Sequence, residues 1–172
     1  TGDEMSGQSQ RSPKRLKHRI CSIVTFPATP IDVSNGISMI DLYSVPTANG
    51  QRVHIMLEET GLPYEPHFVN LRGGEHLEKS FLDKNPFGRV PAIVDNDGPN
   101  GEPISVFEGH AILAYLAEKS GQLYPDDLGV RTQINIWMSA VSANLGPAFA
   151  AQFWFTTLAP ERSDMAIERY IS

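Results

Sequence analysis

The pattern of hydrophobic residues changes at about position 39, after which apolar positions recur with the spacing of regular elements. The apolar run at 40–43 is short and predicts a buried strand. Within 49–60 the apolar positions return every three or four residues, which predicts a helix. Asn49 stands at its start as a candidate N-cap, and Gly61 follows its last apolar position as a stop signal.

Turn residues divide the next stretch into further short elements. Pro66, inside the extended segment 64–69, favours a strand at the edge of a sheet, because proline cannot donate a hydrogen bond to a neighbouring strand. The Asp-Gly-Pro-Asn-Gly sequence at 97–101 is a strong turn signal between two apolar segments. The expected elements are a strand at 64–69, a short helix at 77–84, strands at 91–95 and 104–107, and a helix at 108–119 that Gly121 stops.

This order of elements, βαβ followed by ββα, predicts an α/β domain with a mixed four-stranded sheet and helices packed on it. The first two strands are expected to run parallel because a helix connects them. The two strands around the 97–101 turn are expected to run antiparallel.

A different pattern begins after the predicted linker at 122–126, because only helical periodicity occurs from 127 to 172. One helix is expected from 129 to about 155, with a kink at Gly146-Pro147, and Pro160 can open another. We therefore expect an α/β domain at 39–121 and an all-helical region at 127–172.

Composition and charge narrow the classes of function. The formal net charge is −6, and because residues 1–38 carry +2, the remainder carries −8. An acidic body argues against nucleic-acid binding, and no apolar run is long enough to span a membrane, so we expect a cytoplasmic protein. The single cysteine, Cys21, excludes an internal disulfide framework, a CxxC redox centre and a zinc site built from several cysteines. No metal is expected, and any thiol chemistry needs sulfur from a ligand.

Residues 1–38 are predicted to be a disordered, solvated basic leader or an extension upstream of a natural start at Met39. An alternative interpretation takes the basic run 14–19 as a nuclear or membrane address.

Three motifs carry a family signal. Leu-Tyr-Ser-x-x-Thr-x-Asn-Gly occupies 42–50, Asn-Pro-x-Gly-Arg-Val-Pro-Ala-Ile-Val-Asp occupies 85–95, and Phe-Glu-x-x-Ala-Ile-Leu-x-Tyr-Leu-Ala-Glu-Lys occupies 107–119. In this order they resemble cytosolic glutathione transferases over about residues 39–172. The Thr-x-Asn-Gly turn resembles most the Nu class, which are bacterial glutathione-dependent disulfide-bond reductases, and a related yeast nitrogen-catabolite regulator.

The resemblance implies a thioredoxin-like N-terminal domain and an all-α, incomplete glutathione-transferase C-terminal domain, since the family's helical domain is usually more than twice as long as 127–172. A second departure is Gly109, which follows Glu108 where the family has serine. The hydroxyl that would hold the γ-glutamyl carboxylate is absent, although the backbone N–H of Gly109 can still bind an anion at a helix N-terminus. We therefore expect weakened glutathione binding.

Thr47 and Asn49 are the candidate catalytic residues. A free thiol has a pKa of about 8.5, and lowering it by two units would favour the thiolate by about 2.7 kcal/mol. A hydroxyl, an amide NH2 and free helical N–H groups after a strand can all point at one sulfur. Thr and Asn are also ordinary capping residues, and only the resemblance favours catalysis over capping. Ser44 is the rival thiol-activating residue.

The resemblance also implies the residues that hold the rest of glutathione. A cis peptide at Val90-Pro91 would present the Val90 backbone to the cysteinyl part, in the manner of an added strand. Arg89 and His76 are candidates for the glycyl carboxylate, with an exposed loop histidine as the alternative for His76. Glu108 would take the γ-glutamyl ammonium, next to Gly109, although an acidic residue is also favourable in the first turn of any helix.

Two features have no assigned role. His110 is interpreted as a surface residue, or as a polar contact that replaces the missing serine. The aromatic cluster Phe149, Phe153, Trp154 and Phe155 is interpreted mainly as core, with the wall of an electrophile pocket as the alternative.

The function predicted from the sequence is a glutathione transferase or glutathione-dependent disulfide reductase acting on a disulfide or a small electrophile, with glutathione as co-substrate. The alternative is a non-catalytic glutathione-binding or regulatory protein on the same scaffold, and a third hypothesis is a truncated product without a stable fold. A homodimer with C2 symmetry is expected by analogy.

Overall fold

The computed structural model describes residues 40–171, all within one compact unit, and the predictions made for residues 1–38 lie outside this range. The described chain begins with a βαβ unit that consists of β1 (Ile40–Ser44), α1 (Ala48–Thr60) and β2 (Tyr64–Phe68). Gly61 adopts a left-handed conformation after α1, as the stop signal predicts. The parallel pairing of β1 with β2 is confirmed.

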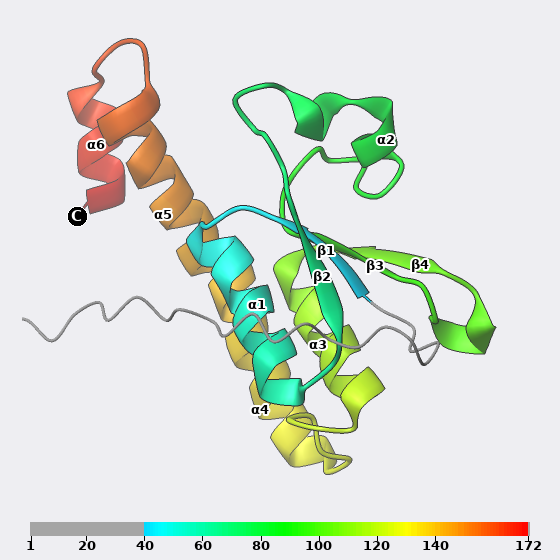
Figure 1. Ribbon diagram of the computed structural model, residues 1–172. Coiled ribbons are helices and arrows are strands. Elements are labelled where there is room, and N and C mark those ends of the chain that lie inside the picture. The colour runs from blue at the N-terminus through cyan, green and yellow to red at the C-terminus, as the bar shows by residue number, and fades with distance from the viewer. Residues whose placement is uncertain (1–39, 172) are drawn as a thin grey trace, which may run out of the picture. The chain divides into compact units, whose positions relative to one another are not determined.

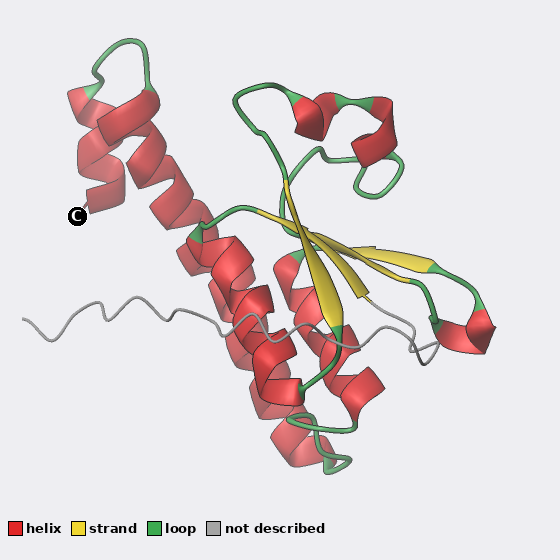
Figure 2. Cartoon of the chain, viewed as in Figure 1, coloured by secondary structure: helices red, strands yellow, loops and turns green. Residues whose placement is uncertain are grey.

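The second half of the sheet is a hairpin. Strands β3 (Ala92–Asp95) and β4 (Ile104–Phe107) pair antiparallel around a short 3₁₀ helix, η3 (Pro99–Gly101), and α3 (Gly109–Ser120) follows. The order across the sheet is β2-β1-β3-β4, with β1 antiparallel to β3 (Figures 1 and 2). The mixed four-stranded sheet is therefore confirmed, and so is the edge position that Pro66 predicts for β2.

Helices α1 and α3 pack against each other on one face of the sheet and bury the main core. Its fully buried members alternate along the strands and recur at helical spacing on the helices: Ile40, Leu42, Val53, Leu57, Ile93, Ile112 and Leu116. A smaller cluster forms where Phe81 packs with Val45, Val69 and Ala92. Phe81 belongs to α2 (Lys79–Leu82), which follows the 3₁₀ helix η2 (Glu75–Leu77), so the helix predicted at 77–84 is two shorter pieces.

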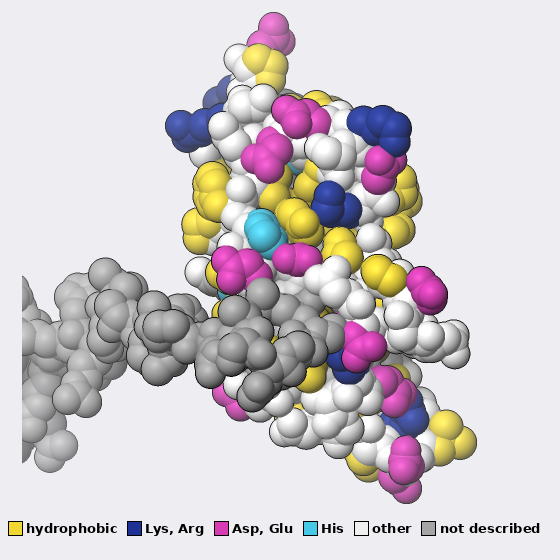
Figure 3. Space-filling model, turned by 45° about the vertical axis from the view of Figure 1, so that its right-hand side comes forward, with side chains coloured by type: hydrophobic (Ala, Val, Ile, Leu, Met, Phe, Trp, Pro, Cys, Tyr) yellow, Lys and Arg dark blue, Asp and Glu magenta, His cyan; other side chains and the backbone are white. Residues whose placement is uncertain are grey.

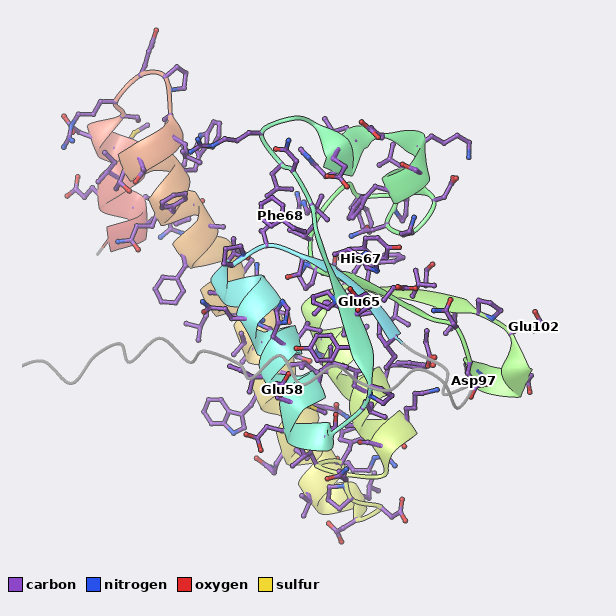
Figure 4. The ribbon with its side chains drawn as sticks, viewed as in Figure 1. Glu58, Glu65, His67, Phe68, Asp97 and Glu102 are labelled. Atoms are coloured by element: carbon purple, nitrogen blue, oxygen red, sulfur yellow. The ribbon has the colours of Figure 1, made fainter. Side chains whose placement is uncertain are left out.

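Asp95 anchors α3 to the end of β3. Its fully buried carboxylate accepts hydrogen bonds from the Tyr115 hydroxyl at 2.5 Å and from the Asp97 backbone N–H at 3.0 Å, and it pairs with Lys119 at 2.8 Å. Burial alone would raise the pKa of Asp95, but these donors and the Lys119 charge hold it below its usual range. Asp97 and Glu102 mark the neighbouring hairpin in Figure 4.

After the linker the chain is helical, as predicted, with different boundaries. Helix α4 (Leu128–Ala140) continues through a π-helical turn, η4 (Val141–Leu145), into α5 (Gly146–Phe153) and a second π turn, η5 (Trp154–Leu158). The π turn takes the place of a simple kink at Gly146-Pro147, because Pro147 has no N–H to donate within the helix. Helix α6 (Asp164–Ile171) begins four residues later than the Pro160 signal predicts.

The interpretation of the aromatic cluster as mainly core is wrong. Phe149 is 65% exposed, Phe153 is 55% exposed and Trp154 is 48% exposed, whereas Phe155 is half-buried and stacks on Tyr170 of α6. On the face drawn in Figure 3, hydrophobic side chains lie at the surface between charged ones. No helix in the range 40–171 combines the length and the apolar character needed to cross a membrane.

Candidate functional site

A cavity of about 270 Å³ lies where four parts of the chain meet. Asn49 and Arg52 come from the first turns of α1, and Glu108 and Gly109 come from the start of α3. The loop before β3 supplies Asn85 and the run Arg89-Val90-Pro91, and the helical region supplies a wall of mostly small or apolar residues: Val141, Ser142, Gly146, Pro147 and Ala150. The sequence-predicted residues Asn49, Arg89, Val90, Glu108 and Gly109 thus line one cavity.

Thr47, not Asn49, is the N-cap of α1, so the prediction of Asn49 as the cap is wrong. The Thr47 side chain accepts a hydrogen bond from the Gly50 backbone N–H at 3.3 Å. This leaves the Asn49 amide side chain free to face the cavity, and the N–H groups of Ala48 and Asn49 have no partner among the described residues. The start of α1 therefore offers several donors to one ligand atom.

Thr47 itself is exposed and is not part of the cavity lining. Ser44, the rival thiol-activating residue, is 5% exposed and donates its hydroxyl hydrogen to the Val45 carbonyl at 3.3 Å. A Cβ on Gly50 would lie 2.4 Å from the Ser44 Oγ and 2.2 Å from the Val45 oxygen, so α1 closes over this hydroxyl. Ser44 is thereby kept away from the cavity.

The loop before β3 is held by Asn85, which is 1% exposed. Its side-chain amide donates to the Arg89 carbonyl at 2.6 Å, and its Oδ1 accepts from the Phe87 N–H at 3.0 Å. The loop therefore presents Arg89 and the Val90 backbone in a defined orientation. The Val90-Pro91 peptide bond is cis, as predicted.

The turn into α3 brings Glu108 and Gly109 to the cavity. Glu108 has a positive φ of 68°, which is uncommon for a residue with a side chain, and its carboxylate makes no capping bond to the helix. Gly109 packs against Arg52: a Cβ on Gly109 would lie 3.4 Å from the Arg52 Cδ and 3.7 Å from its Nη1. The start of α3 and the first turns of α1 thus meet at this pair.

Three charged side chains border the cavity. They are the guanidinium groups of Arg52 and Arg89 and the carboxylate of Glu108. Within the described part of the chain none of the three has an ion-pair partner. A ligand with two negative groups and one positive group would complement them.

His76 is not part of this lining. Its carbonyl oxygen would lie 3.0 Å from a Cβ on Gly88, which places its backbone against the loop that carries Arg89, and its Nδ1 is buried without a hydrogen-bond partner among the described residues. His110 is half-buried and borders a second cavity of about 280 Å³ with Arg52, Leu113 and Trp137. The four residues of the aromatic cluster line neither cavity.

Sequence reasoning missed Arg52, Asn85 and the wall formed by η4 and α5. The position of Arg52, three residues after Asn49 on one helix, places both on the same face, and this spacing was the available signal. The wall had no such signal, because small residues in a helix carry no chemical signature. Across residues 40–171 no three histidine, cysteine or acidic side chains gather as a metal site would require.

Comparison with known proteins finds similarity to one family. Residues 48–119 match the family model described as the glutathione S-transferase N-terminal domain. The chain is 40% identical over 133 residues to the disulfide-bond oxidoreductase YfcG of Escherichia coli, covering 77% of this chain and 62% of that protein. It is 30% identical over 175 residues to the transcriptional regulator URE2 of Saccharomyces cerevisiae, covering 97% of this chain and 47% of that protein.

A solved structure is similar as well. The chain matches a glutathione transferase family member from Pseudomonas fluorescens, crystallised with two glutathione molecules bound. The TM-score is 0.75 at 39% sequence identity, over 80% of this chain and 61% of that one. The chain therefore spans roughly half to three fifths of the length of these relatives.

Proposed function

Because the chain belongs to the glutathione transferase superfamily through its N-terminal domain, we propose that its cavity binds glutathione and activates the thiol for attack on a disulfide or a small electrophile. The observation that carries the proposal is the convergence of Asn49, Arg89, Val90 and Glu108 on one cavity. Glutathione has two carboxylates and one ammonium at neutral pH, which complements two arginines and one glutamate.

The orientation follows from the positions of these groups. The cysteinyl part lies along the Val90 backbone, so the sulfur reaches the start of α1, where the Asn49 amide and the free N–H groups stabilise a thiolate. Thr47 acts indirectly: its side chain accepts the hydrogen bond from the Gly50 N–H that caps α1, and this bond holds the turn in place. Arg89 binds the glycyl carboxylate, and Glu108 binds the γ-glutamyl ammonium. A contact between His76 and the glycyl carboxylate stays a prediction, because His76 lies outside the lining.

Disulfide reduction then takes two steps. The bound thiolate attacks one sulfur of the substrate disulfide, forms a mixed disulfide and releases the other sulfur as a thiolate that takes up a proton. A second glutathione thiolate attacks the glutathione sulfur of the mixed disulfide, which gives oxidised glutathione and the second substrate thiol. Two glutathione molecules are required because the chain has only one cysteine, Cys21. With a small electrophile, the first thiolate instead forms a carbon–sulfur bond.

The test is reduction of 2-hydroxyethyl disulfide by glutathione. Asn49→Ala is expected to lower kcat/KM about tenfold or more and to move its pH profile to higher pH, because the bound thiol loses a donor that lowers its pKa. Gln51→Ala, an exposed amide on the same helix outside the cavity, is the matched control and should leave both unchanged. Cys21→Ser should also keep full activity. Equal background rates for wild type and Asn49→Ala would rule out catalysis at this site.

The second candidate function is a non-catalytic glutathione-binding regulator. The similarity to URE2, which extends over 97% of this chain, supports it. Calorimetric titration with reduced and oxidised glutathione separates the two candidates when combined with the rate assay. Binding without turnover supports the regulator, binding with turnover supports the enzyme, and no binding contradicts both.

A further inference from the structure

Arg52 is the one charged group of the cavity to which the proposed binding mode assigns no partner. It is half-buried, it borders both cavities, and within residues 40–171 it makes no ion pair or hydrogen bond. A guanidinium group withdrawn from solvent beside a cavity is stabilised by an anion that enters the cavity. Arg52 therefore points to an anionic group of the ligand.

The location of Arg52 identifies which anionic group this is. Its side chain lies against Gly109, directly after Glu108, whereas Arg89 comes from a different part of the lining, the loop before β3. An amino-acid head group carries its ammonium and its carboxylate on the same carbon atom, so the groups that bind the two must lie side by side. Glu108 and Arg52 meet this requirement, and Arg89 is left for the carboxylate at the opposite end of the ligand.

We propose, resting on glutathione binding at this site, that Arg52 binds the carboxylate of the γ-glutamyl head group and so selects ligands with a free amino-acid head. The contact with Gly109 places Arg52 at the helix start. The Arg52 Cδ and Nη1 lie 3.4 Å and 3.7 Å from the position of a Cβ there, which is ordinary contact distance, so the guanidinium lies directly against the first residue of α3. The carboxylate then receives the Arg52 donors together with the free N–H groups at the start of α3.

The experiment compares two ligands by calorimetric titration: glutathione and 4-aminobutanoyl-cysteinyl-glycine, which is the same tripeptide without the γ-glutamyl carboxylate. Arg52→Gln is expected to weaken glutathione binding about 10- to 100-fold, the usual size of a hydrogen bond to a charged group. It should leave binding of the shorter analogue unchanged, and wild type should bind the analogue at least as weakly as Arg52→Gln binds glutathione, because the analogue also loses the contact with the N–H groups of α3. Arg52→Lys, which keeps the charge but loses the planar fork, should fall between the two.

Arg72→Gln, an exposed arginine outside both cavities, is the control for loss of a positive charge and should bind both ligands as wild type does. Gly109→Asp is a second variant that keeps Arg52. Its carboxylate would sit within reach of Arg52 and compete with the ligand, so glutathione binding should weaken while binding of the analogue does not. Thermal unfolding of each variant establishes that it is folded.

Each outcome has one meaning. An equal loss of affinity for both ligands in Arg52→Gln, or no loss for glutathione, overturns the role of Arg52 and leaves glutathione binding intact. If wild type binds neither glutathione nor its oxidised form, the proposed function fails, and the assignment of Arg52 fails with it.

Discussion

The start of α1 shows how a single residue type decides local geometry. A Cβ on Gly50 would lie 2.2 Å from the Val45 backbone oxygen and 2.4 Å from the Ser44 Oγ, so only glycine allows the helix to approach the end of β1 this closely. The same approach places Asn49 at the cavity and buries Ser44. Position 50 therefore serves the site through the backbone, without a side chain of its own.

Gly50→Ala is expected to destabilise the protein by about 3 kcal/mol, because the added carbon forces the backbone of α1 away from β1. Denaturant unfolding measures the loss. Gly129→Ala in α4 is the control: its added carbon meets a side-chain oxygen of Asp127 at 3.2 Å in an exposed position, and alanine favours a helix, so little change is expected. An unfolding midpoint for Gly50→Ala equal to that of wild type would contradict the close approach.

At the scale of elements, the contact of α3 with β3 depends on the buried carboxylate of Asp95. Because its donors hold the pKa of Asp95 below the value of about 3.9 found in unfolded chains, the native state favours the ionised form. The stability that this contributes is present above that value and is lost as the pH falls through the lower native pKa. The α3–β3 contact is therefore expected to weaken in acid.

Asp95→Asn should lower the free energy of unfolding by about 3 kcal/mol at neutral pH, because it leaves Lys119 without its buried partner. The difference from wild type should shrink as the pH falls below about 4. Urea unfolding across this pH range gives the measurement. Asp83→Asn, which removes an exposed pair with Lys79, should cost less than about 0.5 kcal/mol at any pH, and an equal cost for both variants would contradict the argument.

At the scale of the whole molecule, the helical region exposes large apolar side chains. Trp137 is 69% exposed, and Phe149 and Phe153 lie further along the same run of helices. Large apolar side chains exposed in such number are typical of an interface. We therefore propose that this surface contributes to the homodimer expected from the family.

Light scattering at micromolar concentration should give twice the mass of one chain for wild type. Phe153→Glu should shift the protein toward the mass of one chain, because a charge would be buried at the interface. Met165→Glu, at an 82% exposed position on α6, is the control and should remain at the wild-type mass. A monomeric wild type would contradict the dimer.

The periodicity of the chain predicted most of the elements within residues 40–121. Alternating apolar positions in β1 and helical spacing in α1 are local properties of the sequence. Gly61, Gly121 and Pro66 also act on their own backbone, so the sequence alone was enough to predict their effects. The sequence pattern assigned the N-cap of α1 to Asn49 instead of Thr47, because both are good capping residues and only the backbone geometry distinguishes them. The aromatic cluster was misjudged because burial depends on what packs against a helix.

The amino-acid sequence by itself determined the order and type of most elements, the resemblance to a family and five of the residues that line the cavity, because these depend on local spacing and on recognisable motifs. Tertiary structure alone decided that Arg52 stands beside Gly109, that Asn85 holds the loop of Arg89 and that Ser44 is closed off. The physical reason is that the first relation joins residues distant in the chain, the second depends on the exact conformation of a loop, and the third depends on the approach of one backbone to another. No spacing along a single element specifies such an approach.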